Sequence, residues 1–339
     1  MSGILASLLS WFKGSQNDSS RDLVDQILKA HTTLVGLDDL QPGEITNETL
    51  GGLVGLCCGS HDSVTVKKVL NHRRIKAILP SLRRISSESE CCLEAYWNSY
   101  IITRARDPKE ALQLLKSFPY FQNYVELSRL ELYALYAVEP SLPRRIAFVG
   151  SGPLPLTSMC LLRSLRDSSI SEAAVETAAV VDGEANGHAK GDDESDDESD
   201  DEKRRPVVVN IDNNATALAT STVLCEQLGA WSEGMAFRCS DACSTMDLSG
   251  YDVVFLAALV GVSQREKEDI ITDVARRMRP GALMVVRSAL GLRTVLYPEV
   301  DLFSDRIREV LQVETVTHPH GKVVNSVIIA RVKAASAPI

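Results

Sequence analysis

Residues 145–159 read Arg-Ile-Ala-Phe-Val-Gly-Ser-Gly-Pro-Leu-Pro-Leu-Thr-Ser-Met, and this stretch decides the fold of the chain. A short apolar strand runs into Gly150, Ser151 and Gly152 and then into a helix, whose first turn tolerates proline. The glycines allow a tight turn, and the helix start presents unpaired backbone N–H groups at the positive end of its dipole. Such a junction is typical of sites for small anionic or nucleotide-like ligands. Because Pro155 replaces the third glycine of G-x-G-x-x-G, the pattern departs from the dinucleotide fingerprint.

Short apolar strands and helices alternate after this junction. The helix expected at 264–278 has its apolar side chains on one face and ends before a Pro-Gly pair. Alternation of this kind predicts a parallel sheet covered on both faces. Two last strands, at 313–317 and 323–332, would close the sheet as an antiparallel hairpin, as in the α/β, Rossmann-like, class I methyltransferase-type fold. The other strands are expected at 146–149, 207–211, 236–239, 253–256 and 283–286.

The first part of the chain has a different pattern, because residues 21–138 read almost entirely as helix. Pro80 is expected to interrupt the long helical stretch between Val69 and Ile102. We therefore predict an N-terminal extension at 1–20, an all-helical N-terminal domain at 21–140 and a Rossmann-like domain at 141–333.

Charge is concentrated in one stretch. The chain has a net charge of −9, and 182–205 alone contains eleven acidic and four basic residues. Residues from about 167 to 205 are therefore predicted to be a disordered acidic insertion. Ser195 and Ser199 each precede three acids, as in substrates of acid-directed kinases; a merely solvated linker is the alternative. The nearly neutral remainder has no basic stripe, so we expect no nucleic-acid partner.

Cysteines and hydropathy exclude other classes. Neighbouring cysteines at 57–58 and 91–92 suit neither a disulfide framework nor zinc, and Cys239 and Cys243 lack a second pair. We expect reduced thiols, no metal site and a cytoplasmic location. No apolar run is long enough to span a membrane, and the N-terminus lacks a signal-peptide pattern. We expect no membrane partner, and a homodimer stays open.

Acidic and apolar side chains after the later strands complete an expected nucleoside site. Ligands of such sheets lie beyond the carboxyl ends of the strands, and a ribose needs an acid about 20 residues after the glycine loop. Asp212 follows Gly152 by 60 residues, and leaving out the 39 residues of the insertion reduces this to 21. We expect Asp212 to bind ribose, Asp241 to accept from an adenine amino group and Ala257 to belong to an apolar wall. The alternatives are a solvent-facing acid for Asp212 and a helix N-cap for Asp241.

Four longer strings point to one family. They are FPYFQNY at 118–124, AFVGSGPLPLTS at 147–158, GYDVVFLAALVG at 250–261 and PGALMVVRSA at 280–289. With them the chain resembles the nicotianamine synthases, from about Leu23 to Pro298. The resemblance implies a helical domain capping a Rossmann-like domain that binds S-adenosylmethionine as substrate, with no true cofactor. The binding residues that we expect from the glycine loop and the strand ends are Gly150, Ser151, Gly152, Asp212, Asp241 and Ala257.

The resemblance also implies the reaction. Three S-adenosylmethionine molecules are joined through their aminobutyrate portions into the metal chelator nicotianamine, with an azetidine ring, and each step releases methylthioadenosine. A sulfonium activates three carbons, and the one that reacts depends on where the nucleophile is held. Because an ammonium has no lone pair, attack on the methylene of the methionine arm needs a base.

A carboxylate and a phenol would meet that need. The resemblance marks Glu94 and Tyr120 as catalytic residues. Glu90, one helical turn from Glu94, would raise one pKa of the pair. Two acids on a solvated face and a core tyrosine are the alternatives.

Three further side chains are expected to anchor the amino-acid ends of the substrate: Asn123, Tyr124 and Arg287. Arg287 suits a bidentate contact with a carboxylate, and a structural role is its alternative. The family often carries a histidine after the fifth strand, whereas residues 289–293 here read Ala-Leu-Gly-Leu-Arg, so substrate handling is expected to differ there.

Two other functions stay open from the sequence. A methyltransferase on the same fold would release S-adenosylhomocysteine instead of methylthioadenosine. A non-catalytic scaffold would bind S-adenosylmethionine and release neither.

Overall fold

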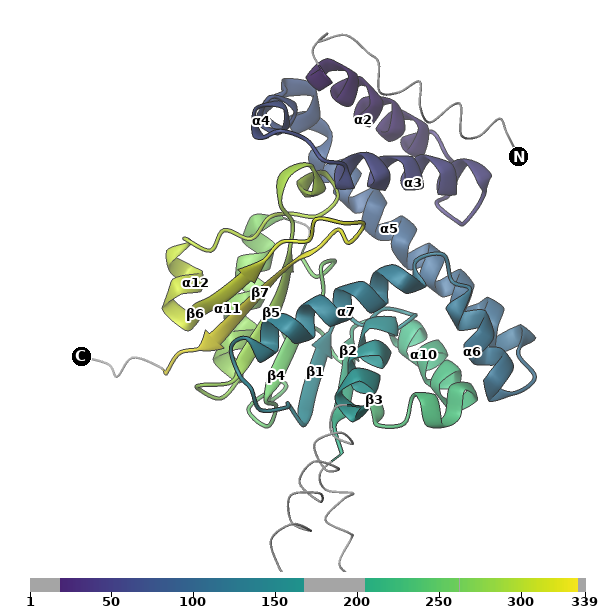
Figure 1. Ribbon diagram of the computed structural model, residues 1–339, viewed down its shortest axis with the longest axis vertical. Coiled ribbons are helices and arrows are strands. Elements are labelled where there is room, and N and C mark those ends of the chain that lie inside the picture. Colours follow the sequence, from purple (N-terminus) through teal and green to yellow (C-terminus); the bar gives the residue numbers. More distant parts are fainter. Residues whose placement is uncertain (1–18, 168–204, 262, 335–339) are drawn as a thin grey trace, which may run out of the picture.

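The computed structural model describes residues 19–167, 205–261 and 263–334 (Figure 1). The expectations for the extreme N-terminus and for most of the acidic insertion, including Ser195 and Ser199, lie outside the described residues.

A seven-stranded sheet with the order β3-β2-β1-β4-β5-β7-β6 forms the centre of the described chain. Strands β1 to β5 pair in parallel, and β7 lies antiparallel between β5 and β6. This order confirms the predicted fold class, including the closing hairpin. The strand bounds are β1 (Arg145–Val149), β2 (Val207–Asp212), β3 (Met235–Cys239), β4 (Val253–Leu256), β5 (Leu283–Ser288), β6 (Leu311–Thr317) and β7 (Ser326–Val332).

Helices cover both faces of the sheet because successive strand side chains alternate between the faces. Ile146 and Phe148 of β1 pack with α7 (Phe121–Tyr136) and with helical residues 156–167. Ala147 and Val149 pack on the opposite side, where α11 (Gln264–Arg277) and α12 (Asp305–Val310) lie. The helix α10 (Ala215–Leu228) packs near the β3 edge, against α6 (Pro108–Lys116).

The first helices lie above the carboxyl ends of the strands (Figure 1). They are α2 (Ser19–Val35), α3 (Glu44–Cys58), α4 (Ser63–Asn71) and α5 (Arg73–Arg104). Their core includes Leu292, Val295 and Leu296, which lie in and just after the 3-10 turn η3 (Gly291–Val295) that follows β5. This shared core holds the helices over the edge of the sheet where ligands bind in such folds.

The expected interruption at Pro80 is wrong. Helix α5 runs through Pro80, and the break lies earlier, at His72, which is extended between α4 and α5. A proline inside a helix loses one hydrogen bond and costs about 3 kcal/mol. Burial of Ile75, Leu82 and Ile85 on both sides of Pro80 offsets that cost.

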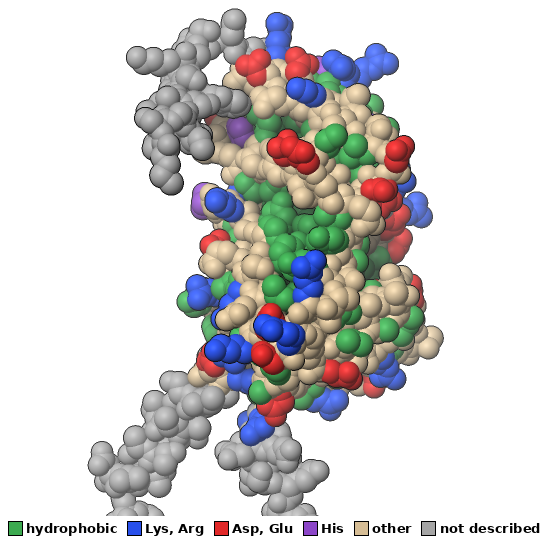
Figure 2. Space-filling view, turned by 90° about the vertical axis from the view of Figure 1, so that its right-hand side faces the viewer, with side chains coloured by type: hydrophobic (Ala, Val, Ile, Leu, Met, Phe, Trp, Pro, Cys, Tyr) green, Lys and Arg blue, Asp and Glu red, His purple; other side chains and the backbone are tan. Residues whose placement is uncertain are grey.

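Helix α7 packs on the sheet although it belongs to the predicted helical part, and the three-part domain division stays a prediction. Among the described helices, none is long and apolar enough to cross a bilayer. Figure 2 shows Lys and Arg interspersed with Asp and Glu on the face it presents, with hydrophobic side chains gathered in its middle.

Candidate active site

The glycine loop after β1 has the conformation that only glycine adopts easily. Gly150 and Gly152 have φ of 81° and 66°. A Cβ on Gly150 would lie 2.3 Å from Cγ2 of Val260, and one on Gly152 would lie 2.7 Å from Oε2 of Glu94. The Gly152 N–H donates to Oδ2 of Asp212 at 2.9 Å. The loop therefore makes close contact with the β4 side, with helix α5 and with the end of β2.

A cavity of about 670 Å³ opens at the carboxyl ends of β1, β2, β3 and β4. It lies where the strand order reverses between β1 and β4, the position at which such sheets bind ligands. All six residues that we expect to bind S-adenosylmethionine line this cavity: Gly150, Ser151, Gly152, Asp212, Asp241 and Ala257. The hydroxyl of Ser151 is buried and has no hydrogen-bond partner among the described residues.

Both aspartates also have local structural roles. Asp212 accepts from the backbone N–H groups of Gly152 and Asn214, one on each oxygen. Asp241 accepts from the N–H of Cys243 at 2.8 Å, in a turn. Each carboxylate keeps lone pairs on the cavity side, so turn formation and ligand binding are compatible.

A second cavity, of about 140 Å³, lies between helices α3, α5 and α7 and the segment before β7. Tyr120 and Asn123 line this cavity and not the larger one. Five residues line both: Glu90, Glu94, Tyr124, Arg287 and Asn325. These five side chains stand at the boundary of the two cavities.

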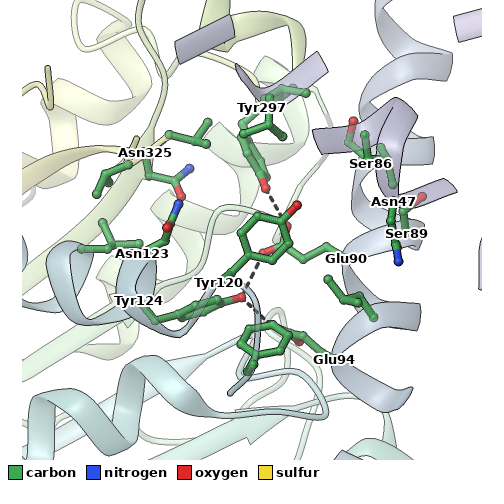
Figure 3. Close-up of a pocket in the computed structure, with 18 of the residues that line it drawn as sticks. Asn47, Ser86, Ser89, Glu90, Glu94, Tyr120, Asn123, Tyr124, Tyr297 and Asn325 are labelled. Carbon is green, nitrogen blue, oxygen red and sulfur yellow. Dashed lines mark hydrogen bonds between the residues drawn. The ribbon is translucent and has the colours of Figure 1, made fainter. Parts of the chain in front are cut away.

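Two carboxylates and two phenols form a connected cluster at this boundary (Figure 3). The Tyr124 hydroxyl lies 2.6 Å from Oε1 of Glu94 and 3.2 Å from Oε1 of Glu90. The Tyr297 hydroxyl donates to Oε2 of Glu90 at 2.5 Å. Figure 3 shows the two phenols reaching the carboxylates of α5 from two sides. The predicted pairing of Glu90 with Glu94 is thus part of a larger network.

Burial sets the protonation of this cluster. Glu94 is only 7% exposed, and burial together with the nearby charge of Glu90 raises its pKa well above the usual value. Burial and the same carboxylates raise the pKa values of Tyr124 and Tyr297, so both phenols keep their protons and donate. Burial also raises the pKa of Tyr120. Glu94 is therefore a carboxyl whose proton affinity responds to charge placed in the cavity.

Arg287 is already paired within the protein. Its Nε lies 2.7 Å from Oε1 of Glu131, and its Nη2 donates to Oε2 of Glu131 at 3.2 Å and to Oγ1 of Thr157 at 3.0 Å. All three groups are buried. The edge of the guanidinium formed by Nε and Nη2, which suits a bidentate contact with a substrate carboxylate, is thus occupied by Glu131. Only Nη1 remains for a ligand. Asn123 likewise donates to the backbone carbonyl of Lys322, at 3.3 Å.

Sequence reasoning missed Tyr297 and Asn325. Tyr297 is 207 residues from Glu90, so no local pattern connects them. Asn325 falls inside the strand predicted at 323–332, but β7 begins at Ser326, and the Nδ2 of Asn325 is buried without a partner among the described residues. Within the same residues, no group of three or more His, Cys, Asp or Glu side chains could hold a metal ion.

Comparison with known proteins gives consistent matches. The family model described as "Nicotianamine synthase protein" matches residues 15–337. Nicotianamine synthase 9 of Hordeum vulgare is 40% identical over 254 residues, which cover 74% of this chain and 62% of that protein. The nicotianamine synthase of Solanum lycopersicum is 33% identical over 92% of this chain and 84% of its own.

Solved structures of MtNAS have the same fold. A glutamate-to-glutamine mutant of MtNAS has a TM-score of 0.67 at 17% identity, covering 94% of this chain and 100% of that one. The complex of MtNAS with MTA and tNA has a TM-score of 0.65 at 19% identity, covering 91% and 98%.

Proposed function

This chain belongs to the nicotianamine synthase family, and we infer that it condenses three S-adenosylmethionine molecules into nicotianamine, releasing methylthioadenosine at each step. S-Adenosylmethionine is the substrate, and the enzyme is a transferase of aminobutyrate groups. Structures of MtNAS have been solved with S-adenosylmethionine and with MTA and tNA, which supports this activity for the shared fold.

The observation that carries the proposal is the boundary between the cavities. A donor sulfonium and an acceptor amine must meet, and here a nucleoside-sized cavity meets a second cavity at two carboxylates and two phenols. Holding two reactants in one orientation accounts for a large part of a rate enhancement.

We propose that the adenosine half of the donor lies in the larger cavity, between the glycine loop and Asp212. Its aminobutyrate arm then points to the boundary, and the acceptor amine approaches from the smaller cavity, beside Tyr120 and Asn123. The amine nitrogen forms a bond to the methylene carbon as the carbon–sulfur bond breaks. The electron pair goes to sulfur, so the leaving group is neutral methylthioadenosine.

Glu94 is the proposed base, because it lines both cavities. Its raised pKa makes it an effective proton acceptor once the positive sulfonium enters and favours the ionised form. Tyr120 is proposed to orient the acceptor from the smaller cavity, together with Asn123. Tyr124 holds Glu94, and Arg287 with Glu131 provides a fixed wall rather than a free carboxylate clamp.

The test is to incubate the purified protein with S-adenosylmethionine alone and to identify all products by mass. Methylthioadenosine and nicotianamine are expected at about 3:1. Release of S-adenosylhomocysteine would instead indicate methyl transfer, and a bound but unreacted ligand would indicate a scaffold. A cytoplasmic location, a kinase acting on Ser195 and Ser199, and a homodimer stay predictions.

A further inference from the structure

Lys267 is a fully buried lysine beneath the wall of the larger cavity. It lies in the first turns of α11, and its Nζ donates to the backbone carbonyls of Ala258 at 2.8 Å and Val260 at 3.2 Å. Within the described part of the chain, no salt bridge joins it to a carboxylate. Burying a cation without a counter-ion is unfavourable, and a methionine would fill similar space without that cost. The two carbonyl contacts are therefore the reason for a lysine here.

These carbonyls belong to the loop at 257–261, which lines the larger cavity along its whole length. The loop wraps tightly around the lysine, because a Cβ on Gly261, whose φ is 80°, would lie 3.0 Å from Cγ of Lys267. Carbonyl groups that turn inward in a loop need a donor, and the ammonium supplies two hydrogen bonds at once.

The same loop supports the glycine loop. The side chain of Val260 occupies the space that a Cβ on Gly150 would need, 2.3 Å away, and the Ala257 N–H donates to the carbonyl of Val149 at 3.0 Å. A shift of Val260 would therefore move both walls of the cavity, the loop at 257–261 and the glycine loop.

We propose that Lys267 is a positioning residue for S-adenosylmethionine: its ammonium holds the loop at 257–261 against the glycine loop, so that the adenosine site is formed before the ligand arrives. The inference rests on the proposed function only for the identity of the ligand. Preorganisation of this kind improves affinity by removing the entropic cost of ordering the loop on binding.

Charges around Lys267 make its contribution depend on pH. Burial, together with the cations Arg287 of β5 and Arg83 of α5, lowers its pKa to about 7, and the loop at 257–261 has no ionisable side chain. Above that pH the neutral amine keeps two N–H groups, but its hydrogen bonds lose the assistance of charge and weaken.

The test is the affinity for S-adenosylhomocysteine, a non-reacting probe of the adenosine site, measured by calorimetry. Lys267→Met is expected to raise Kd at least tenfold at pH 6 and to raise KM for S-adenosylmethionine similarly, with kcat within threefold of wild type. Arg265→Met, an exposed change in the first turn of the same helix, is the matched control and should leave Kd unchanged.

The ratio of the two Kd values should fall as pH rises from 6 to 8.5, because the wild-type ammonium loses its proton in that range. Titration of Glu94 contributes to the Kd of both proteins and cancels in the ratio.

A Kd for Lys267→Met within twofold of wild type at pH 6 would overturn the proposal, as would a loss confined to kcat. Should the methionine variant fail to fold, Lys267→Gln carries the test: it has two donors without charge, its Kd should be raised at pH 6, and the ratio of its Kd to that of wild type should fall as pH rises to 8.5. Because these measurements report binding, they test the role of Lys267 separately from whether the enzyme forms nicotianamine.

Discussion

Replacing Glu94 by glutamine separates its role as a base from its role in packing. Oε1 of Glu94 accepts the Tyr124 hydroxyl at 2.6 Å, and the amide oxygen of glutamine can accept the same bond. The two side chains have nearly the same volume, so the boundary between the cavities should keep its shape. Only the ability to take a proton at this position is lost.

The expected loss of rate is large because no neighbour can replace the carboxylate. Removal of a general base reduces a rate by about 10²–10⁴-fold. The phenols of Tyr124 and Tyr297 keep their protons, and Glu90 already accepts the hydroxyl of Tyr297. We therefore expect kcat to fall about 10³-fold, which corresponds to about 4 kcal/mol of barrier. The Kd for S-adenosylmethionine should stay within about threefold of wild type.

The raised pKa of Glu94 gives two further signatures. In the free protein, the folded state holds the Glu94 proton more tightly than the unfolded state. The contribution of this proton to the free energy of unfolding is therefore complete at low pH and is lost as pH rises from the usual carboxyl range to the raised pKa. Binding of the positive sulfonium should release the proton, which calorimetry in two buffers of different ionisation enthalpy detects. Both effects should be absent in Glu94→Gln.

The assay is the release of methylthioadenosine, followed by mass over single and multiple turnovers. Glu88→Gln is the matched control, because Glu88 lies on the same helix, half exposed and 3.6 Å from Arg84, and should be fully active. A Glu94→Gln variant that releases methylthioadenosine within tenfold of the wild-type rate would refute the assignment of Glu94 as base.

Three other predictions follow from the same contacts. Gly150→Ala places a Cβ 2.3 Å from Val260 and should weaken S-adenosylmethionine binding at least tenfold by calorimetry; unchanged affinity would contradict the close fit of these loops. Glu131→Gln leaves the buried Arg287 without its counter-ion and should lower the free energy of unfolding by about 3–5 kcal/mol in urea titrations, whereas a loss below 1 kcal/mol would argue against a tight ion pair. Deleting 182–205 should leave turnover in place, because the chain enters β2 at its amino end, Val207, and the cavity lies at the carboxyl ends of the strands; loss of turnover in a still-folded protein would show otherwise.

The sequence alone was sufficient for everything that depends on local spacing. The strand that leads into Gly150, the alternation of strands and helices, and the acid at the end of β2 are local patterns, and they led to the fold class and to one wall of the larger cavity. Glu94 was identified through the resemblance to the family, since its own surroundings in the sequence also suit a solvated helix face.

Only the tertiary structure decided which groups meet at the boundary of the cavities. Glu90 contacts Tyr297 across 207 residues, and Arg287 contacts Glu131 across 156, so that Glu131 occupies part of the guanidinium that we expected to bind a substrate carboxylate. Local patterns cannot encode such pairs, because helix and strand periodicity specify which face of an element is buried but not which distant side chain it meets. The continuity of α5 through Pro80 has the same origin, since burial on both sides of the proline outweighs one lost hydrogen bond.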